Sequence, residues 1–225
     1  MHPHPQVART HVQTTASELD ELLAREGGAS AALRFLAIHC GLRRDVARLA
    51  SAFGRAAGDV EVTLVVRRFW EVFAYVLRGH HEVEDKMVFP AVVALEPSLE
   101  DVVTALDREH AALHPLLAAL DAAVAALPSA EGAVQGGAAI RELEALLLPH
   151  FAMEEEHLLP VMRRLPPPPP SAPTPEPRVL AWAVLDASPA FTEAFGAGLS
   201  DEERAEITRL RSELDAIAAV CFGDV

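Results

Sequence analysis

The chain has 225 residues, enough for one domain with an appendage or for two small domains, and enough to bury a core without disulfide bonds. Its formal charge is −14, from 33 acidic and 19 basic residues. Such a surface repels phosphate backbones and anionic lipids, so we expect neither a nucleic-acid nor a membrane partner. Two cysteines provide no disulfide framework, and the absence of a signal-peptide-like apolar stretch near the N-terminus favours a cytoplasmic protein.

The predicted elements are helices, because alanine, leucine and valine dominate a chain that is only 5% aromatic. An N-terminal segment (1–28) contains a short helix over about 16–26. A bundle of long helices follows over 29–165, with helices at about 30–58, 59–95, 98–127 and 137–164. Eight prolines in 166–177 predict an extended linker. The tail, 178–225, contains two shorter helices, the second with a capping box at Ser200 and Glu203, and we interpret it as a packing or partner-contact appendage.

Histidines are concentrated in the four long predicted helices. Seven of the ten fall there: His39, His80, His81, His110, His114, His150 and His157. Three pairs of residues lie four apart and therefore share a helix face: His80 and Glu84, His110 and His114, His150 and Glu154. Imidazole suits iron, zinc, copper or nickel, and a carboxylate can bridge two ions.

The same helix pair occurs twice in the sequence. His39 precedes His80 by 41 residues, and His110 precedes His150 by 40. The segment HHEVEDKMVFP (80–90) also matches HFAMEEEHLLP (150–160) in its first His, its Glu and its final Pro. Two such hairpins packed together bring donors from four helices to one level of a bundle. Burying so many titratable groups without a metal is costly, so the pattern predicts a metal centre.

These motifs resemble the hemerythrin-like, or HHE cation-binding, domain family over about residues 30–164. The segments that carry the resemblance are FLAIHCGLRRDVARL, HHEVEDKMVFP, EHAALHPLL and HFAMEEEHLLP. The resemblance implies an all-α, up-down four-helix bundle that holds two non-heme iron ions joined by an oxo or hydroxo bridge. It implies two sets of iron ligands, His110, His114 and His150 for one ion and His39 and His80 for the other, with Glu84 and Glu154 bridging both.

Three neighbouring side chains need separate interpretation. Oxygen-carrying members of the family have an aspartate five residues after the last helix's histidine, where this chain has Glu155. Bacterial HHE proteins resemble this chain in using the glutamate at the fourth position, so we choose Glu154 and leave Glu155 as an alternative. His81 lies about 100° around the helix from His80 and is expected to face outward. His157 is expected not to be a ligand.

The resemblance favours a non-enzymatic protein that binds or senses dioxygen or a related small molecule such as peroxide or nitric oxide. The second imidazole set then leaves its iron a vacant position. A di-iron peroxidase or a nitric-oxide-related repair enzyme is one alternative, and an iron-reservoir or interaction module is another. Manganese or zinc fits the same donors, so the sequence leaves the identity of the metal open.

Overall fold

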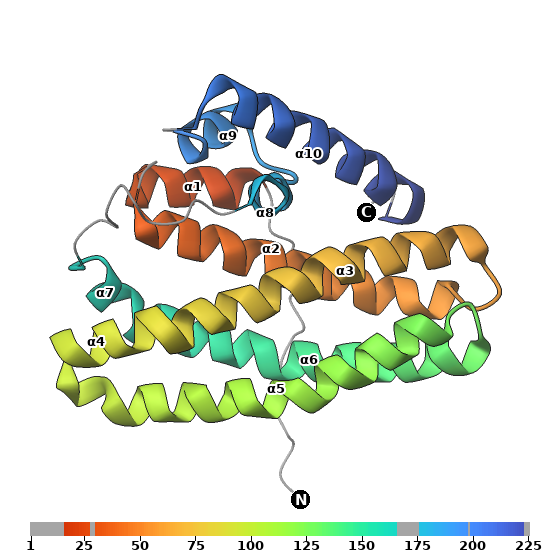
Figure 1. Ribbon diagram of the computed structural model, residues 1–225, viewed down its shortest axis with the longest axis horizontal. Coiled ribbons are helices and arrows are strands. Elements are labelled where there is room, and N and C mark those ends of the chain that lie inside the picture. Colours follow the sequence, from red (N-terminus) through yellow and green to blue (C-terminus); the bar gives the residue numbers. More distant parts are fainter. Residues whose placement is uncertain (1–15, 28–29, 166–175, 198, 223–225) are drawn as a thin grey trace, which may run out of the picture.

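The computed structural model describes residues 16–27, 30–165, 176–197 and 199–222. Within these ranges the chain forms helices and connecting turns and no strand, so the predicted all-helical class is confirmed (Figure 1). None of the described helices combines the length and the apolar character needed to cross a membrane. Most of the predicted proline-rich linker lies outside the described residues.

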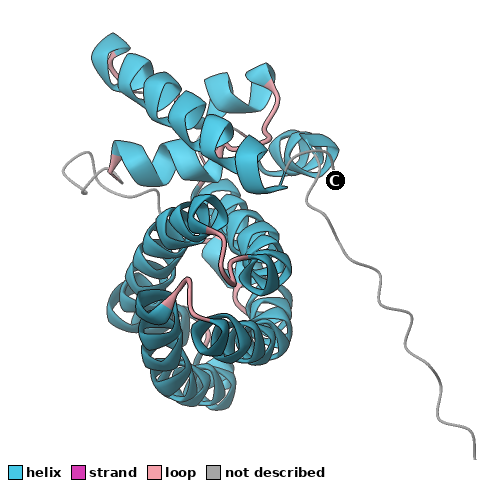
Figure 2. Ribbon diagram, turned by 90° about the vertical axis from the view of Figure 1, so that its right-hand side faces the viewer, coloured by secondary structure: helices cyan, strands magenta, loops and turns pink. Residues whose placement is uncertain are grey.

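Four long helices lie side by side around the main core, as the end-on view shows (Figure 2). They are α2 (Ala31–Ala52), α3 (Val60–Val83), α5 (Glu100–Ala126) and α6 (Ala130–His157). The chain continues from α3 through a π-helical turn (Glu84–Val88) into α4 (Phe89–Leu95). Short 3₁₀ turns, Phe53–Arg55 and Pro97–Leu99, connect neighbouring helices. The side chains of Ser30, Asp59 and Ser129 cap α2, α3 and α6.

Helix α6 begins seven residues before the predicted start at 137, because Ser129 caps it and two glycines continue the helix instead of interrupting it. Gly136 faces the fully buried ring of Phe53, and a Cβ built on Gly136 would lie 2.2 Å from that ring. The glycine therefore allows the ring to approach the helix backbone closely.

Replacing Gly136 by alanine is expected to destabilise the protein by about 1–3 kcal/mol, because the Phe53 ring must move out of a packed position. Gly79, in α3, is the matched control, since nothing lies within 4 Å of its built Cβ. Gly79→Ala should stabilise the metal-free protein by about 0.5–1 kcal/mol through helix propensity. Urea unfolding of both variants measures the difference, and equal effects would contradict the packing role of Gly136.

The C-terminal helices pack on the outside of the bundle, over α2 and α3 (Figures 1 and 2). They are α8 (Pro177–Ala183), α9 (Pro189–Phe195) and α10 (Asp201–Phe222); α1 (Ala16–Glu26) lies beside them and the short α7 (Leu159–Met162) follows α6. Ser200 and Glu203 form the predicted capping box: the Ser200 hydroxyl accepts from the Glu203 amide at 3.2 Å, and the Glu203 carboxylate accepts from the Ser200 amide at 2.8 Å.

A buried polar cluster fastens α8 to α2. The indole of Trp182 is fully buried, and its Nε1–H donates to Asp45 Oδ2 at 2.6 Å. Arg44 donates to the other oxygen of Asp45 at 2.7 Å and to the backbone carbonyls of Trp182 and Leu185 at 3.3 and 3.2 Å. Helix α2 is therefore covered on both faces, by the bundle on one side and by the C-terminal helices on the other. This is the helix that carries His39.

Candidate metal centre

Six of the seven predicted ligands come together inside the bundle. The side chains of His39, Glu84, His110, His150 and Glu154 are at most 3% exposed, and that of His80 is 8% exposed. They form two groups that share Glu84, and within each group the potential ligand atoms lie within 4.8 Å of one another. The first group is His39, His80, Glu84 and Glu154; the second is His81, Glu84, His110 and His150.

The imidazoles converge in pairs, one pair from each half of the repeated sequence. The Nε2 atoms of His39 and His80 are 3.0 Å apart, and those of His110 and His150 are 3.1 Å apart. Each pair joins a histidine from the first helix of a hairpin to one from the second. The sequence repeat therefore appears in space as two similar half-sites.

The two glutamates span both half-sites. Glu84 places Oε1 3.1 Å from His80 Nε2 and Oε2 3.6 Å from His110 Nε2. Glu154 places Oε2 3.3 Å from His39 Nε2 and Oε1 3.2 Å from His150 Nε2. Each carboxylate thus directs one oxygen to each pair of imidazoles, which is the arrangement that a bridging carboxylate requires.

Five of the inner polar atoms lack hydrogen-bond partners. Both oxygens of Glu84, both oxygens of Glu154 and Nε2 of His81 are buried without a hydrogen bond. Leaving a buried polar atom unpaired costs on the order of 1–3 kcal/mol, and more for a charged group. Five such atoms directed into one small region fit a pair of cations, because metal coordination would satisfy all of them together. The residues present therefore suit a dinuclear metal group.

Outer carboxylates orient three of the inner histidines by accepting from their Nδ1–H groups. The pairs are His39 with Glu155 at 2.8 Å, His110 with Asp85 at 2.7 Å and His150 with Glu109 at 2.9 Å. An imidazole held this way keeps its proton on Nδ1 and directs an unprotonated Nε2 inward, which is the form that binds a metal. The pairs also separate the roles of Glu154 and Glu155: the first faces inward, and the second holds His39 from outside.

The expectation that His81 faces outward is wrong. Its side chain is only 7% exposed, and its ring stacks on that of His110 with the centroids 4.0 Å apart. Leu77 and Glu84 lie on the buried face of the helix. Around the helix axis, His80 projects to one side of these two residues and His81 projects to the other. The two adjacent imidazoles therefore flank Leu77 and Glu84, and each reaches a different half-site. The sequence does contain a signal for the burial of His81, because the apolar Leu77 stands four residues before it on the same helix face.

His114 lies in neither group, and its position is exposed. The buried line of α5 has steps of three and four residues: Leu106, His110, Leu113, Leu117 and Leu120. His114 is the residue after Leu113 and is not part of this buried line. It therefore turns towards solvent, although it stands four residues from His110. His81 provides the third imidazole on this side in its place. His157 is half-buried and also lies in neither group.

Replacing His81 and His114 by alanine separately tests this exchange. We expect His81→Ala to weaken metal binding by more than about tenfold, since even outer partners of metal ligands are typically worth 10–100-fold. We expect His114→Ala to bind metal as the wild type does. Titration of the metal-free proteins with Co(II), followed by absorbance, measures both affinities. A larger loss in His114→Ala would restore the ligand set implied by the sequence.

A π-helical turn begins at Glu84, where the Phe89 amide donates to the Glu84 carbonyl. The wider turn changes which side chains face the bundle. Glu84 points inward, Asp85 holds His110, and the Phe89 ring stacks on His110 with the centroids 5.4 Å apart. Single π-turns within α-helices often occur at functional sites. Neither the turn nor the outer carboxylates were predicted from the sequence.

Burial and neighbouring charges disfavour the charged forms of several of these side chains, most strongly those of His80, His81 and Glu84. Burial lowers the pKa of His80 well below its usual value, with a further contribution from His39, and burial likewise lowers the pKa of His81. Burial and the charge of Glu154 raise the pKa of Glu84 well above its usual value. Neutral imidazoles beside two confined carboxylates attract cations.

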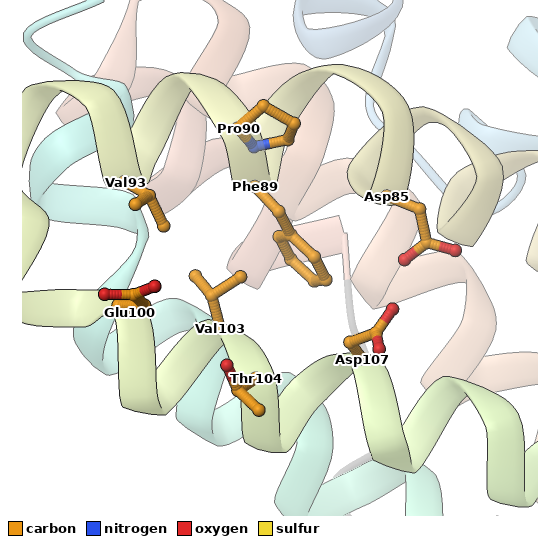
Figure 3. Close-up of a pocket in the computed structure, with 8 residues that line it drawn as sticks. All are labelled: Asp85, Phe89, Pro90, Val93, Glu100, Val103, Thr104 and Asp107. Atoms are coloured by element: carbon orange, nitrogen blue, oxygen red, sulfur yellow. The ribbon is translucent and has the colours of Figure 1, made fainter.

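A surface pocket of about 370 Å³ lies between α4 and α5, next to the second half-site (Figure 3). Asp85 and Phe89 line it, and both also contact His110. Figure 3 shows the carboxylates of Asp85 and Asp107 facing each other across its edge. A single layer of side chains, Asp85 and Phe89, therefore separates His110 from the solvent in this pocket.

Buried histidines and bridging glutamates within a helical bundle are features of a metal-binding protein. The family model described as hemerythrin HHE cation binding domain matches residues 33–166, which is more than half of the chain. The chain belongs to this family, as the sequence motifs predicted. Comparison with curated proteins and with solved structures finds no match.

Proposed function

We propose that the protein holds two non-heme iron ions in an up-down four-helix bundle and uses them to bind or sense dioxygen or a related small molecule. The observation that carries this proposal is the set of five buried, unpaired atoms from His81, Glu84 and Glu154. A pair of ferrous ions at this centre would supply electrons to a small oxidant. The family membership supports cation binding independently.

The two half-sites offer different numbers of nitrogen donors. His81, His110 and His150 provide three imidazoles on one side, whereas His39 and His80 provide two on the other. With Glu84 and Glu154 contributing to both, the two-imidazole side has fewer protein donors. We assign the small molecule to that side.

Aromatic rings surround the two-imidazole side and keep bulk water out. Phe35 lies 4.1 Å from the His39 ring and Phe151 lies 4.3 Å from it, measured between ring centroids. Both phenylalanines are buried. Such surroundings favour an uncharged diatomic ligand over a large polar substrate, which supports binding or sensing over turnover.

Metal analysis and oxygen absorption spectra test the proposal. Protein purified without chelators should contain two metal ions per chain, and anaerobic loading with Fe(II) should reach the same ratio. Admitting oxygen should then produce new near-ultraviolet absorption. Sustained catalytic consumption of peroxide or nitric oxide would indicate an enzyme instead. A large rise in melting temperature with iron but no oxygen-dependent absorption would indicate an iron reservoir.

A further inference from the structure

The outer carboxylates that hold the inner histidines are not equivalent. Glu155, which holds His39, also pairs with Arg43, whose Nη1 lies 2.8 Å from Glu155 Oε1. The same oxygen lies 2.8 Å from His39 Nδ1. Among the described residues, no arginine or lysine forms an ion pair with Asp85 or Glu109, which hold His110 and His150. One of the three histidine–carboxylate pairs therefore carries a cation.

Arg43 is fixed in this position by its other contacts. Its guanidinium lies over the Phe151 ring, 5.3 Å from the centroid, and that ring stacks on His39 at 4.3 Å with an interplanar angle of 26°. The Arg43 side chain is 20% exposed, so its charge is only partly screened by solvent. A cation thus contacts both the carboxylate and the aromatic neighbour of one metal-facing imidazole.

The repeated helix pair emphasises this difference. Arg43 follows His39 by four residues, and the matching position after His110 is His114. His114 is exposed and forms no ion pair with Asp85 in the described structure. The two halves therefore match in their inner imidazoles and glutamates, but only one half has a cation on its outer carboxylate.

Sharing one carboxylate oxygen between His39 and Arg43 has an electronic consequence. A carboxylate that accepts from imidazole Nδ1–H makes Nε2 a stronger electron donor to a metal. The guanidinium withdraws electron density from that carboxylate and adds positive charge near the site, so His39 becomes a weaker donor than His110 or His150. Both effects disfavour a cation at this half-site, and they disfavour its oxidised state more.

We infer that Arg43 is a positioning and tuning residue that acts through Glu155 to increase the inequality that the different numbers of imidazoles already give the two metal sites. The half-site of His39 and His80 takes up its ion second, binds it more weakly, and keeps it more readily reduced. This inference rests on the proposed function, since it concerns the same pair of ions. The inference gives a role to Arg43, which is not itself a proposed metal ligand, and it states the direction in which Arg43 changes metal affinity and reduction potential.

Stepwise Co(II) titration of the full-length, metal-free chain, followed by absorbance, tests the inference. The wild type should show two unequal binding steps. Arg43→Gln should tighten the second step several-fold, and Arg43→Lys should restore the wild-type value because it keeps the charge. Glu155→Gln should weaken the second step by about tenfold or more, the usual cost of losing an outer carboxylate. Asp85→Asn should weaken the first step instead.

A matched control and a second measurement separate tuning from simple support. Arg68→Gln removes an arginine from an ion pair with Glu71 and should change neither step, because Arg68 lies twelve residues, more than three helical turns, before the nearest histidine, His80. In reductive titrations of the iron-loaded proteins, Arg43→Gln should lower and Glu155→Gln should raise the reduction potential of one iron. The opposite signs are the signature of an electronic role.

Three outcomes would overturn the inference. A second step weakened by Arg43→Gln would mean that the arginine only holds Glu155 in place. A second step unchanged by Arg43→Gln would mean that it has no role. A wild-type chain that binds fewer than two Co(II) ions would remove the proposed function and this inference with it, and that result is distinguishable because it appears before any substitution is made.

Discussion

Replacing Trp182 by alanine is expected to destabilise the protein by about 3–5 kcal/mol, the range found when a large buried aromatic is removed. Trp182 is fully buried between α8 and α2, and a Cβ built on Gly41 would lie 2.6 Å from its ring. Its loss leaves a cavity against α2 and removes the indole donor from the fully buried Asp45. Urea unfolding of the metal-free protein gives the magnitude.

Two companion variants distinguish the cavity from the hydrogen bond. Trp182→Phe keeps most of the ring volume and should cost roughly 1–2 kcal/mol for the lost hydrogen bond. Gly41→Ala should destabilise the wild type but be tolerated in the Trp182→Ala background, where the ring no longer blocks a methyl group. Independent, additive effects would show that the ring and the glycine do not interact as the structure indicates.

The loss of Trp182 should also reach the metal centre. Helix α2 carries His39, and the C-terminal helices cover the face of α2 opposite the bundle. We expect Trp182→Ala to lose metal first from the half-site of His39 and His80, with the second half-site less affected. Such a loss would show that the tail is part of the fold that holds the centre.

The sequence could predict the helix pairs and most of the inner residues because one rule governs them. Residues four apart share a helix face, and this rule brought Glu84 to His80 and Glu154 to His150. The matched spacing of His39 and His110 placed the remaining two imidazoles. These are local or periodic relations, so they can be read without knowing how the helices pack.

The same rule failed where packing, and not spacing, decides the direction of a side chain. Four residues of helix exceed one full turn by about 40°. After His110 the buried line of α5 continues at Leu113, three residues on, so His114 lies on the other side of His110 and turns outward. His81 turns inward because the buried line passes between it and His80. Arg44 and Asp45 are neighbouring charges that the sequence places naturally at a surface. They are buried only because residues more than 130 positions later cover them.

Replacing Glu84 by glutamine is expected to abolish most of the stabilisation by metal while leaving the metal-free protein at least as stable as the wild type. Glu84 contributes to both half-sites, so its loss weakens both. In the metal-free state its two oxygens are buried without hydrogen bonds beside Glu154. Burial and Glu154 already disfavour the charged form of Glu84. A neutral amide removes this cost at every pH and can donate to Glu154, a hydrogen bond to a charged group worth about 1.5–3 kcal/mol.

The wild type should instead gain about 4 kcal/mol from metal at a thousand times its dissociation constant. Thermal unfolding with and without Co(II) gives both numbers for each protein. Glu82→Gln is the control, because Glu82 lies two residues before Glu84, in the last turn of α3, is 62% exposed and pairs only with Lys86 among the described ion pairs. It should change neither value appreciably. A metal-free Glu84→Gln protein less stable than the wild type would mean that the buried carboxylates stabilise one another without cations. A metal-binding site lowers the stability of the metal-free protein and raises it when metal binds. A structural polar network, in contrast, stabilises the protein without metal.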